Sequence, residues 1–425
     1  MSVPVFIVTG ANGGVGFGIC KRLLLQLSTE NPPDSWPQQW ATRSTHPDVA
    51  LEPPTANGLT LILACRSVAR AEAARDDLYH QLDAHIKLLR KHKEYDGYAD
   101  EFRHNLTIEV EQVDLARLDT VFAFAQRVAA RHPYISHLIF NAGAANWTGI
   151  IWSIAIRQLC TDFLGAFIRP LFGRQSQGDM SEDGLGLTFQ ANLFGHYAMF
   201  RALEPLLQNP SYEPDARVIW SSSLESTPRF YDPSDWQLVK NPKSYESVKY
   251  QIDLVATVLA HRASQCHATK RVQHFVSQPG IAHTKIAGGI AAVGGFLDTC
   301  KLMLFYLVRI LFNTRHHAIS TTNAAIAAVH LSLVAMSFVT FSPKGKPTNG
   351  HVNGNGHAPV LPPTFKGVNL SEPVRFGAEC TRWGDPEVGL TPVEAWKENE
   401  PNAEALVVHC EELYDSFVAR RKTNA

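Results

Sequence analysis

Three residue types suited to carbonyl chemistry follow one another in the second half of the chain. Tyr245 and Lys249 are four residues apart, a spacing that places both on one face of a helix. A lysine ammonium beside a phenol stabilises the tyrosinate and lowers the tyrosine pKa, which makes the phenol a usable proton donor near neutral pH. Upstream, the apolar run from Arg217 predicts a strand that ends in three serines, the last of them Ser223. A serine hydroxyl beside the phenol could hydrogen-bond a substrate carbonyl, although Tyr-x-x-x-Lys also occurs by chance in many helices.

A glycine-rich turn lies at the start of the chain, between a predicted buried strand, Val5 to Val8, and a helical run. Its spacing is Thr-Gly-x-x-x-Gly-x-Gly. Glycines in a strand-turn-helix context allow the backbone to approach a pyrophosphate, which then lies at the positive end of the helix. Taken alone, such a sequence is also compatible with a simple turn. The residues predicted to contact the cofactor here are Gly10, Asn12, Gly14, Val15 and Gly16.

Arg66 follows the second predicted strand, Leu59 to Ala64, where an acidic residue would bind the ribose 2′-hydroxyl of NAD. Neither Asp nor Glu occurs at this point, and a guanidinium suits a 2′-phosphate. The sequence therefore predicts NADPH as the cofactor. The alternative is an arginine that only faces solvent.

Two further strand ends carry residues that suit a dinucleotide. The strand predicted over Leu106 to Val113 closes on Asp114, whose carboxylate could accept a hydrogen bond from the adenine amino group. The next strand, His137 to Phe140, is followed by Asn141, Ala142 and Gly143, which would let the ribose pass close to the strand end. Strands and helices that alternate in this way predict an α/β fold with a Rossmann-type doubly wound parallel sheet.

Taken in order, TGANGGVG, Asp114, the NAG motif, the serines and Tyr-x-x-x-Lys resemble the extended short-chain dehydrogenase/reductase superfamily. The resemblance implies that Tyr245 donates a proton, that Lys249 tunes it, and that both contact the cofactor. Ser223 would orient the carbonyl, with Ser222 as the alternative. Asn192, in a helix predicted over Leu187 to Leu207, would anchor a proton-relay water, unless it is a polar group in helix packing. The segment that folds over the nicotinamide in this superfamily corresponds to Pro279, Gly280, Ile281 and Thr284.

Insertions at about 31–58, 144–187 and 229–243 interrupt this pattern. The phrases GLTFQANLFGHY, VIWSSSLES, SYESVKYQIDLV and RFGAECTRWGDPEVG resemble the fungal 3-keto-steroid reductases, which are related to 17β-hydroxysteroid dehydrogenase type 7. That resemblance implies reduction of the 3-oxo group of a zymosterone-type sterol to the 3β-alcohol during C-4 demethylation in ergosterol biosynthesis. It implies as partners a sterol ketone and a complex of the C-4 methyl oxidase, the C-3 decarboxylase and a tether. The place would be the cytosolic face of the endoplasmic reticulum membrane, or lipid droplets.

Two other functions remain compatible with the sequence. The first is a carbonyl reductase of another lipid or of a secondary metabolite. The second is a scaffold that tethers sterol enzymes without turnover, which would have no need of the Ser, Tyr and Lys residues.

Composition limits the remaining classes. The chain has 425 residues and a net charge of −1, so no basic surface for nucleic acid is expected. Its seven cysteines are scattered and its eighteen histidines show no ligand spacing, so neither a disulfide framework nor a metal site is predicted. The first strand begins within five residues of Met1, which leaves no room for a signal peptide.

The pattern predicts one reductase domain over 1–341, a low-complexity linker over 342–363, and a small C-terminal tail over 364–425 with one helix at about 398–421. Further helices are expected over 67–103 and 318–341. The most apolar segment, 294–312, carries a narrow stripe of charges formed by Asp298, Lys301 and Arg309. This segment is either a lid packed over the substrate or a helix lying in a membrane interface.

Overall fold

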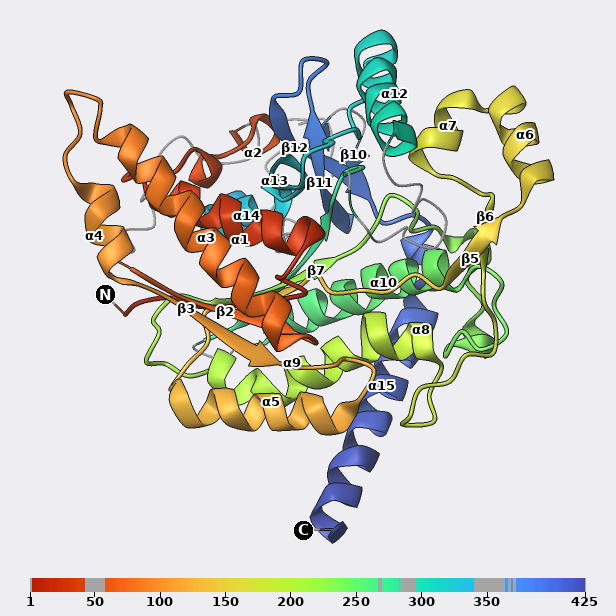
Figure 1. The fold of residues 1–425 in the computed structure, drawn as a ribbon. Helices are drawn as coiled ribbons and strands as arrows, with labels where there is room; N and C mark the ends of the chain where they lie inside the picture. Colours follow the sequence, from red (N-terminus) through yellow and green to blue (C-terminus); the bar gives the residue numbers. More distant parts are fainter. Residues whose placement is uncertain are drawn as a thin grey trace, which may run out of the picture.

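The sheet at the centre of the molecule has the strand order β12-β11-β8-β7-β4-β1-β2-β3 in the computed structural model (Figure 1). The structure describes residues 2–42, 58–266, 270–282, 284, 296–339, 364–365, 368–369 and 372–424. All neighbouring pairs are parallel except β11 and β12. The strands are β1 (Val5–Thr9), β2 (Leu59–Cys65), β3 (Leu106–Gln112), β4 (His137–Phe140), β7 (Ala216–Ser221), β8 (Val272–Gln278), β11 (Val374–Cys380) and β12 (Pro386–Pro392).

Helices cover both faces of this sheet, as the doubly wound prediction requires (Figure 1). On one face lie α1 (Gly14–Leu27), α3 (Val68–Leu89), α4 (Tyr98–His104), α13 (Thr321–Ala324) and α14 (Ile326–Leu333). On the other face lie α5 (Leu118–Arg131), α9 (Gly195–Leu207), α10 (Ser244–Gln265) and α15 (Trp396–Asn424). Alternate side chains of β1 enter the two cores, since Ile7 packs in one and Phe6 and Val8 in the other. The fold prediction is confirmed.

Two predicted helices are shorter than expected. The helix expected over 67–103 is divided into α3 and α4 by turns at 90–97, and α4 begins directly after Gly97, whose φ of +89° favours glycine. The helix expected over 318–341 is likewise divided into α13, α14 and a 3₁₀ turn (Met336–Phe338), since Val334 and Ala335 adopt extended backbone conformations.

The helix predicted over Leu187 to Leu207 is present as three consecutive parts. These are α8 (Leu187–Phe189), a π-helical turn (Gln190–Phe194) and α9. The π turn contains Asn192, and such turns occur frequently at functional sites.

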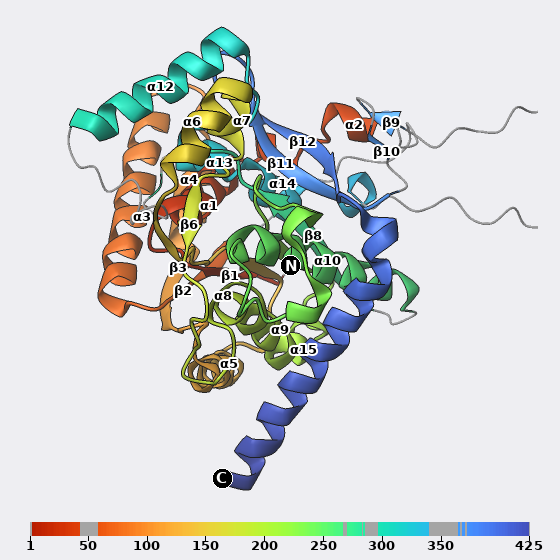
Figure 2. The same cartoon turned by 90° about the vertical axis from the view of Figure 1, so that its right-hand side faces the viewer.

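The predicted insertion at 144–187 forms a hairpin with a helical tip. Strands β5 (Trp147–Ile150) and β6 (Gly173–Gln175) pair with each other, and α6 (Trp152–Thr161) and α7 (Phe163–Ile168) project from their end (Figures 1 and 2). The insertion at 229–243 contains two 3₁₀ turns (Pro228–Phe230 and Pro233–Asp235). The insertion at 31–58 begins with a 3₁₀ turn (Pro33–Ser35) and α2 (Gln39–Thr42), and its remainder at 43–57 lies outside the described residues, as does the predicted linker at 342–363.

The C-terminal segment contributes two strands to the central sheet as well as a helix. Its strand β11 pairs with β8 and its strand β12 closes the edge of the sheet, while a short ladder joins β9 (Thr364–Phe365) to β10 (Val368–Asn369). Helix α15 then runs along α10, where Arg262 forms ion pairs with Glu404 at 2.8 Å and Glu411 at 2.9 Å (Figure 2). The segment predicted as a helical tail therefore completes the central sheet.

Candidate active site

Tyr245 and Lys249 lie in the first two turns of α10, and both side chains are buried. Strand β7 ends beside them at Ser221. The Lys249 ammonium donates a hydrogen bond of 2.8 Å to the Ser221 carbonyl, and its Nζ is 5.7 Å from the centre of the Tyr245 ring. The structure thus brings together the strand end and the helix that the sequence predicted to share one site.

The two candidate serines face different partners. Ser222 is buried and its hydroxyl is directed at α10, where it hydrogen-bonds the Lys249 carbonyl at 3.5 Å and the Asp253 carboxylate. Ser223 hydrogen-bonds the Tyr245 side chain, and its Oγ also accepts a bond of 3.1 Å from the Glu225 backbone N–H. The geometry therefore favours Ser223 as the serine that meets a carbonyl beside the phenol.

Burial dominates the electrostatics of this site. It raises the pKa of Tyr245 above its usual value, and the nearby Glu225 adds to the increase, while the bond with Ser223 opposes it. Burial lowers the pKa of Lys249 to about 8, against the opposing effect of Asp253 and Glu225. Burial also raises the pKa of Glu225 to about 8. The expectation that Lys249 lowers the Tyr245 pKa is not met in this arrangement, because desolvation of the phenolate is the larger effect.

Asn192 is buried in the π turn and all of its amide hydrogens are used. Its Nδ2 donates to the carbonyls of Ala144 and Thr188 at 2.9 Å each, and its Oδ1 accepts from the Ala144 N–H at 3.1 Å. A Cβ on Gly143 would lie 2.7 Å from this Oδ1. Asn192 therefore holds the backbone that follows β4, and its predicted role at a relay water stays a prediction.

His196, which the sequence reasoning missed, connects Asn192 to the glycine turn. The Asn192 carbonyl accepts from Nδ1 at 2.9 Å, so Nε2, 3.0 Å from the Thr9 hydroxyl, is left as an acceptor. The same Thr9 oxygen accepts the N–H groups of Asn141 and Ala142 at 2.9 and 3.0 Å. Burial lowers the pKa of His196 to about 3, so the ring is neutral. Its spacing of four residues from Asn192 in one helix was the signal available in the sequence.

The glycine turn has the close packing that its sequence predicted. Gly10 and Gly14 have φ of +67° and +53°, values that favour glycine. A Cβ on Gly16 would lie 2.3 Å from the Gly10 carbonyl oxygen and 2.5 Å from Asn141 Nδ2. Thr284 lies beside Gly14, since a Cβ there would be 3.6 Å from the Thr284 methyl group. These residues fit a dinucleotide phosphate, because Gly13 and Gly14 at the start of α1 are exposed.

The other predicted cofactor residues occupy the same edge of the sheet. Arg66 is exposed just beyond β2, whose last residue, Cys65, directs its sulfur at the backbone N–H groups of Ala11 and Asn12. Asp114 follows β3 and accepts the Ala116 N–H at 3.1 Å. Arg70, one helical turn after Arg66, is also exposed and is a second cation that the sequence reasoning missed.

The predicted nicotinamide segment is anchored from the C-terminal side of the chain. The Ile281 N–H donates to the His316 carbonyl at 2.7 Å, and Ile281 accepts from the Ile319 N–H at 2.8 Å. A Cβ on Gly280, the residue after Pro279, would lie 2.7 Å from the Ala378 carbonyl oxygen of β11. The segment therefore lies between the end of β8 and the added strand β11.

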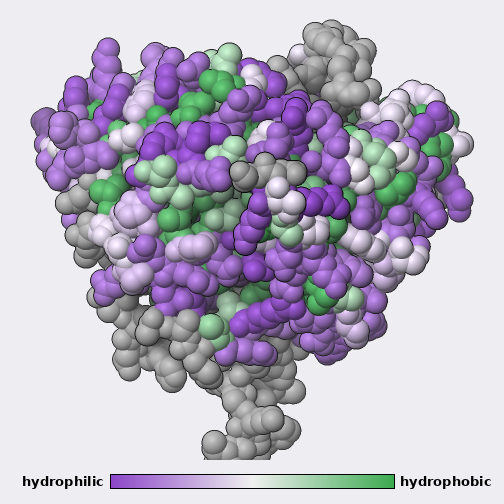
Figure 3. Space-filling view, turned by 90° about the horizontal axis from the view of Figure 1, so that it is seen from below, coloured by the Kyte–Doolittle hydropathy of each residue, from purple (hydrophilic) through white to green (hydrophobic). Residues whose placement is uncertain are grey.

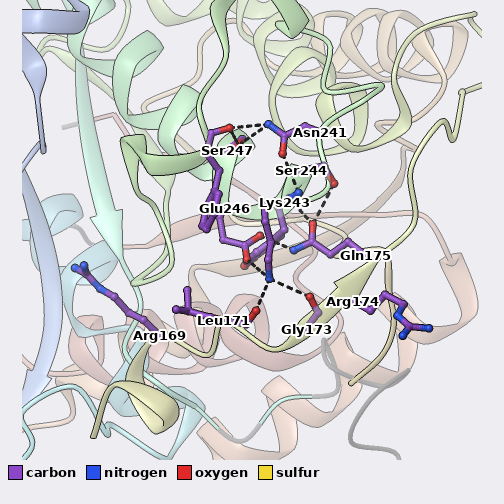
Figure 4. A network of polar contacts seen from close by, with 12 residues as sticks. Arg169, Leu171, Gly173, Arg174, Gln175, Asn241, Lys243, Ser244, Glu246 and Ser247 are labelled. Carbon is purple, nitrogen blue, oxygen red and sulfur yellow. Dashed lines mark hydrogen bonds and ion pairs between the residues drawn. The ribbon is translucent and has the colours of Figure 1, made fainter. Parts of the chain in front are cut away.

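The insertion holds the start of α10. The buried Gln175 of β6 accepts the Tyr245 backbone N–H at 2.8 Å through Oε1 and donates to the Glu246 carboxylate through Nε2. Lys243 pairs with Glu246 at 3.2 Å and donates to backbone carbonyls of the insertion at 2.8 and 3.0 Å (Figure 4). The Trp147 ring meets the Tyr245 ring edge to face at 5.7 Å. No local motif marks Gln175 or Trp147, so sequence reasoning did not identify them.

Several curated proteins that are similar to this chain are named 3-keto-steroid reductase. No protein-family model matches the chain. The 3-keto-steroid reductase of Aspergillus fumigatus is 28% identical over an alignment of 424 residues, which covers 93% of this chain and 83% of that protein. That of Schizosaccharomyces pombe is 27% identical over 388 residues, with 91% and 90% covered. That of Debaryomyces hansenii is 28% identical over 331 residues, with 77% and 80% covered.

Solved structures are more distant. The 3-oxoacyl-[acyl-carrier protein] reductase from Brucella melitensis in complex with NAD is 15% identical, with a TM-score of 0.45, and the similarity covers 80% of this chain and 94% of that one. This chain is thus similar to fungal proteins named 3-keto-steroid reductase over most of its length.

Proposed function

We propose that this protein is an NADPH-dependent 3-keto-steroid reductase of ergosterol biosynthesis. Its substrate would be a zymosterone-type ketone formed during C-4 demethylation, and its product the 3β-alcohol. The observation that carries the proposal is the convergence of Ser223, Tyr245 and Lys249 at the end of β7, in a chain that is similar over most of its length to proteins named 3-keto-steroid reductase.

NADPH supplies the hydride when it is bound. The glycine turn would hold its pyrophosphate at the N-terminus of α1, with Asn12 and Val15 in the same turn. Arg66 would receive the 2′-phosphate, and Asp114 the adenine. The exposed guanidinium of Arg66 and the lack of an acid between Cys65 and Arg70 support NADPH over NADH.

Three side chains of the protein would then bind and protonate the substrate carbonyl. Ser223 would donate a hydrogen bond to the carbonyl oxygen, which polarises it and places it beside the Tyr245 phenol. Because burial raises the Tyr245 pKa, the phenol stays protonated at neutral pH and is ready to deliver its proton to the developing alkoxide. The Lys249 ammonium would stabilise the tyrosinate left behind.

Helix α12 (Phe296–Phe312) exposes apolar side chains and buries its arginine. Met303, Leu307 and Leu311 follow one another at every fourth position and are 63%, 52% and 66% exposed. Arg309, by contrast, is only 6% exposed and donates to the His317 carbonyl at 3.4 Å. At Arg309 the predicted charged stripe therefore faces the protein, while Lys301 is half-buried and the Asp298 side chain lies outside the described part.

The tip of the insertion continues this apolar surface. Trp152 and Ile156 of α6 are 69% and 61% exposed, and Phe163 of α7 meets Phe312 of α12 with ring centres 5.7 Å apart. The face below the sheet is mostly hydrophilic by comparison (Figure 3). No described helix is long and apolar enough to span a bilayer. The exposed apolar residues of α6, α7 and α12 support a shallow contact with the surface of the endoplasmic reticulum or of lipid droplets. At that surface the protein would encounter the sterol and the other C-4 demethylation enzymes.

The experiment is to incubate the purified full-length protein in detergent micelles with NADPH and a panel of ketones that includes zymosterone-type sterols. We expect the sterol ketone to be converted to the 3β-alcohol, identified by mass spectrometry against authentic standards. Preference for a non-sterol ketone would replace the proposal by a general lipid carbonyl reductase. Binding of NADPH without turnover of any ketone would favour a scaffold.

A further inference from the structure

We propose that Arg375, supplied by the C-terminal segment, is a positioning residue for the catalytic serine. Its Nη1 donates to the Ser223 carbonyl at 3.3 Å and pairs with Asp253 Oδ2 at 3.3 Å. Ser223 and Asp253 precede it by 152 and 122 residues in the chain. The inference rests on the proposed function, because it assigns Ser223 to the carbonyl.

The sheet explains how so distant a residue reaches the site. Strand β11 pairs with β8 so that Phe376 lies opposite Ser277, and Arg375 is the residue just before Phe376. The Ser277 carbonyl in turn accepts the Ser222 backbone N–H at 2.8 Å, at the point where β7 ends. The start of β11 therefore lies beside the end of β8, and β8 alone separates it from the end of β7.

The contacts of Arg375 join three separate pieces of backbone. The side chains of Arg375 and Asp253 are each only 1% exposed. Asp253 lies one helical turn after Lys249 in α10, and it also accepts from the Ser226 hydroxyl at 2.5 Å. Arg375 therefore links β11 both to the loop that carries Ser223 and to the helix that carries the lysine.

The positive charge of Arg375 compensates the buried carboxylate of Asp253. Asp253 is fully buried, and a buried carboxylate without a cation is strongly unfavourable, so removal of the guanidinium should displace the loop or protonate the acid. In either case the Ser223 carbonyl loses its donor, and Ser222 and Ser226, which both hydrogen-bond Asp253, lose their common anchor. The effect should reach the Ser223 hydroxyl, whose position depends on this backbone.

The test compares Arg375→Lys, Arg375→Met and the double variant Arg375→Gln/Asp253→Asn in the full-length chain. The double variant removes both charges of this pair, so it remains informative if Arg375→Met does not fold. We expect kcat to fall about tenfold to a hundredfold in the Met and double variants. NADPH affinity should change less than twofold, and Arg375→Lys should recover a large part of the rate. The matched control is Arg22→Met, which breaks a buried pair with Asp34 (2.7 Å) in the C-terminal half of α1 and should lower the melting temperature but keep kcat.

A folded Arg375→Met or double variant with the wild-type kcat would overturn the proposal, as would an equal loss of kcat in Arg22→Met. Hydrogen exchange of residues 221–226 separates this inference from the proposed function. Faster exchange there in the Arg375 variants supports positioning even if the wild-type protein reduces no sterol ketone. Unchanged exchange refutes positioning whatever the substrate.

Discussion

The pKa of Lys249 leads to a specific pH dependence for reduction. A lysine is an ammonium below its pKa and a neutral amine above it. With a pKa of about 8, Lys249 is roughly 90% charged at pH 7 and roughly 10% charged at pH 9. If the ammonium is needed to stabilise the Tyr245 phenolate as it forms, kcat/KM for NADPH should fall about tenfold over this range. A lysine at its ordinary pKa would remain about 97% charged at pH 9, and the rate would hardly change.

The assay follows NADPH absorbance at saturating ketone, from pH 6 to pH 10, because kcat/KM reports the ionisation of the free enzyme. Tyr245 adds no fall in this range, since its pKa is raised. Glu225 titrates near the same pH and needs a control. Its carboxylate raises the Lys249 pKa, so Glu225→Gln should shift the fall in rate to lower pH and keep its amplitude.

A second variant, Lys249→Arg, keeps the positive charge at every pH of the assay. Its rate should be lower overall, because the guanidinium has a different shape, but it should not fall between pH 7 and pH 9. A fall that persists in Lys249→Arg, or that disappears in Glu225→Gln, would refute the assignment to Lys249. A flat wild-type profile would show either that burial does not lower the Lys249 pKa or that the ammonium is not needed, and both results would refute the reasoning.

Three further predictions address the proton donor, the cofactor and the membrane. Tyr245→Phe removes the phenol hydroxyl and keeps the ring against Trp147, so turnover should fall by about a hundred- to ten-thousand-fold while NADPH still binds by fluorescence titration. Arg66→Ala should reduce the preference for NADPH over NADH in kcat/KM, and equal use of both by the wild type would contradict the cofactor prediction. Replacement of Leu304, Leu307 and Leu311 by Ser should release the protein from microsomes in flotation assays and spare activity on a short, soluble cyclic ketone; loss of that activity as well would show that α12 is a lid or core helix.

The sequence predicted the parts of the fold that local patterns determine. Short apolar runs bounded by glycine or polar residues gave β1, β2 and β4 nearly to the residue, because buried parallel strands are recognised by composition and length. The Ser223, Tyr245 and Lys249 group was also predicted, since the spacing within a helix and the position after a strand are local properties.

The pairing of the C-terminal strands was not predicted, for a physical reason. Strand β11 joins β8 across about a hundred residues of chain, and nothing in RFGAEC specifies which edge it should occupy. Arginine is usually exposed, so composition gave no reason to place Arg375 in the interior. Its burial follows only from the partner Asp253, which lies on another element.

The insertion and the C-terminal segment both hold α10, one from before it in the sequence and the other from after it. Gln175 in the insertion fixes the Tyr245 backbone, and Arg375 in the C-terminal segment fixes Asp253 two turns further along α10. The insertion that holds Tyr245 also carries the exposed Trp152 at its tip, and its Phe163 touches α12. The elements that hold Tyr245 are therefore continuous with the apolar surface that we propose contacts the membrane. A sterol entering from that surface would pass the insertion before it reached Tyr245, so the same hairpin would serve both substrate entry and the alignment of the donor.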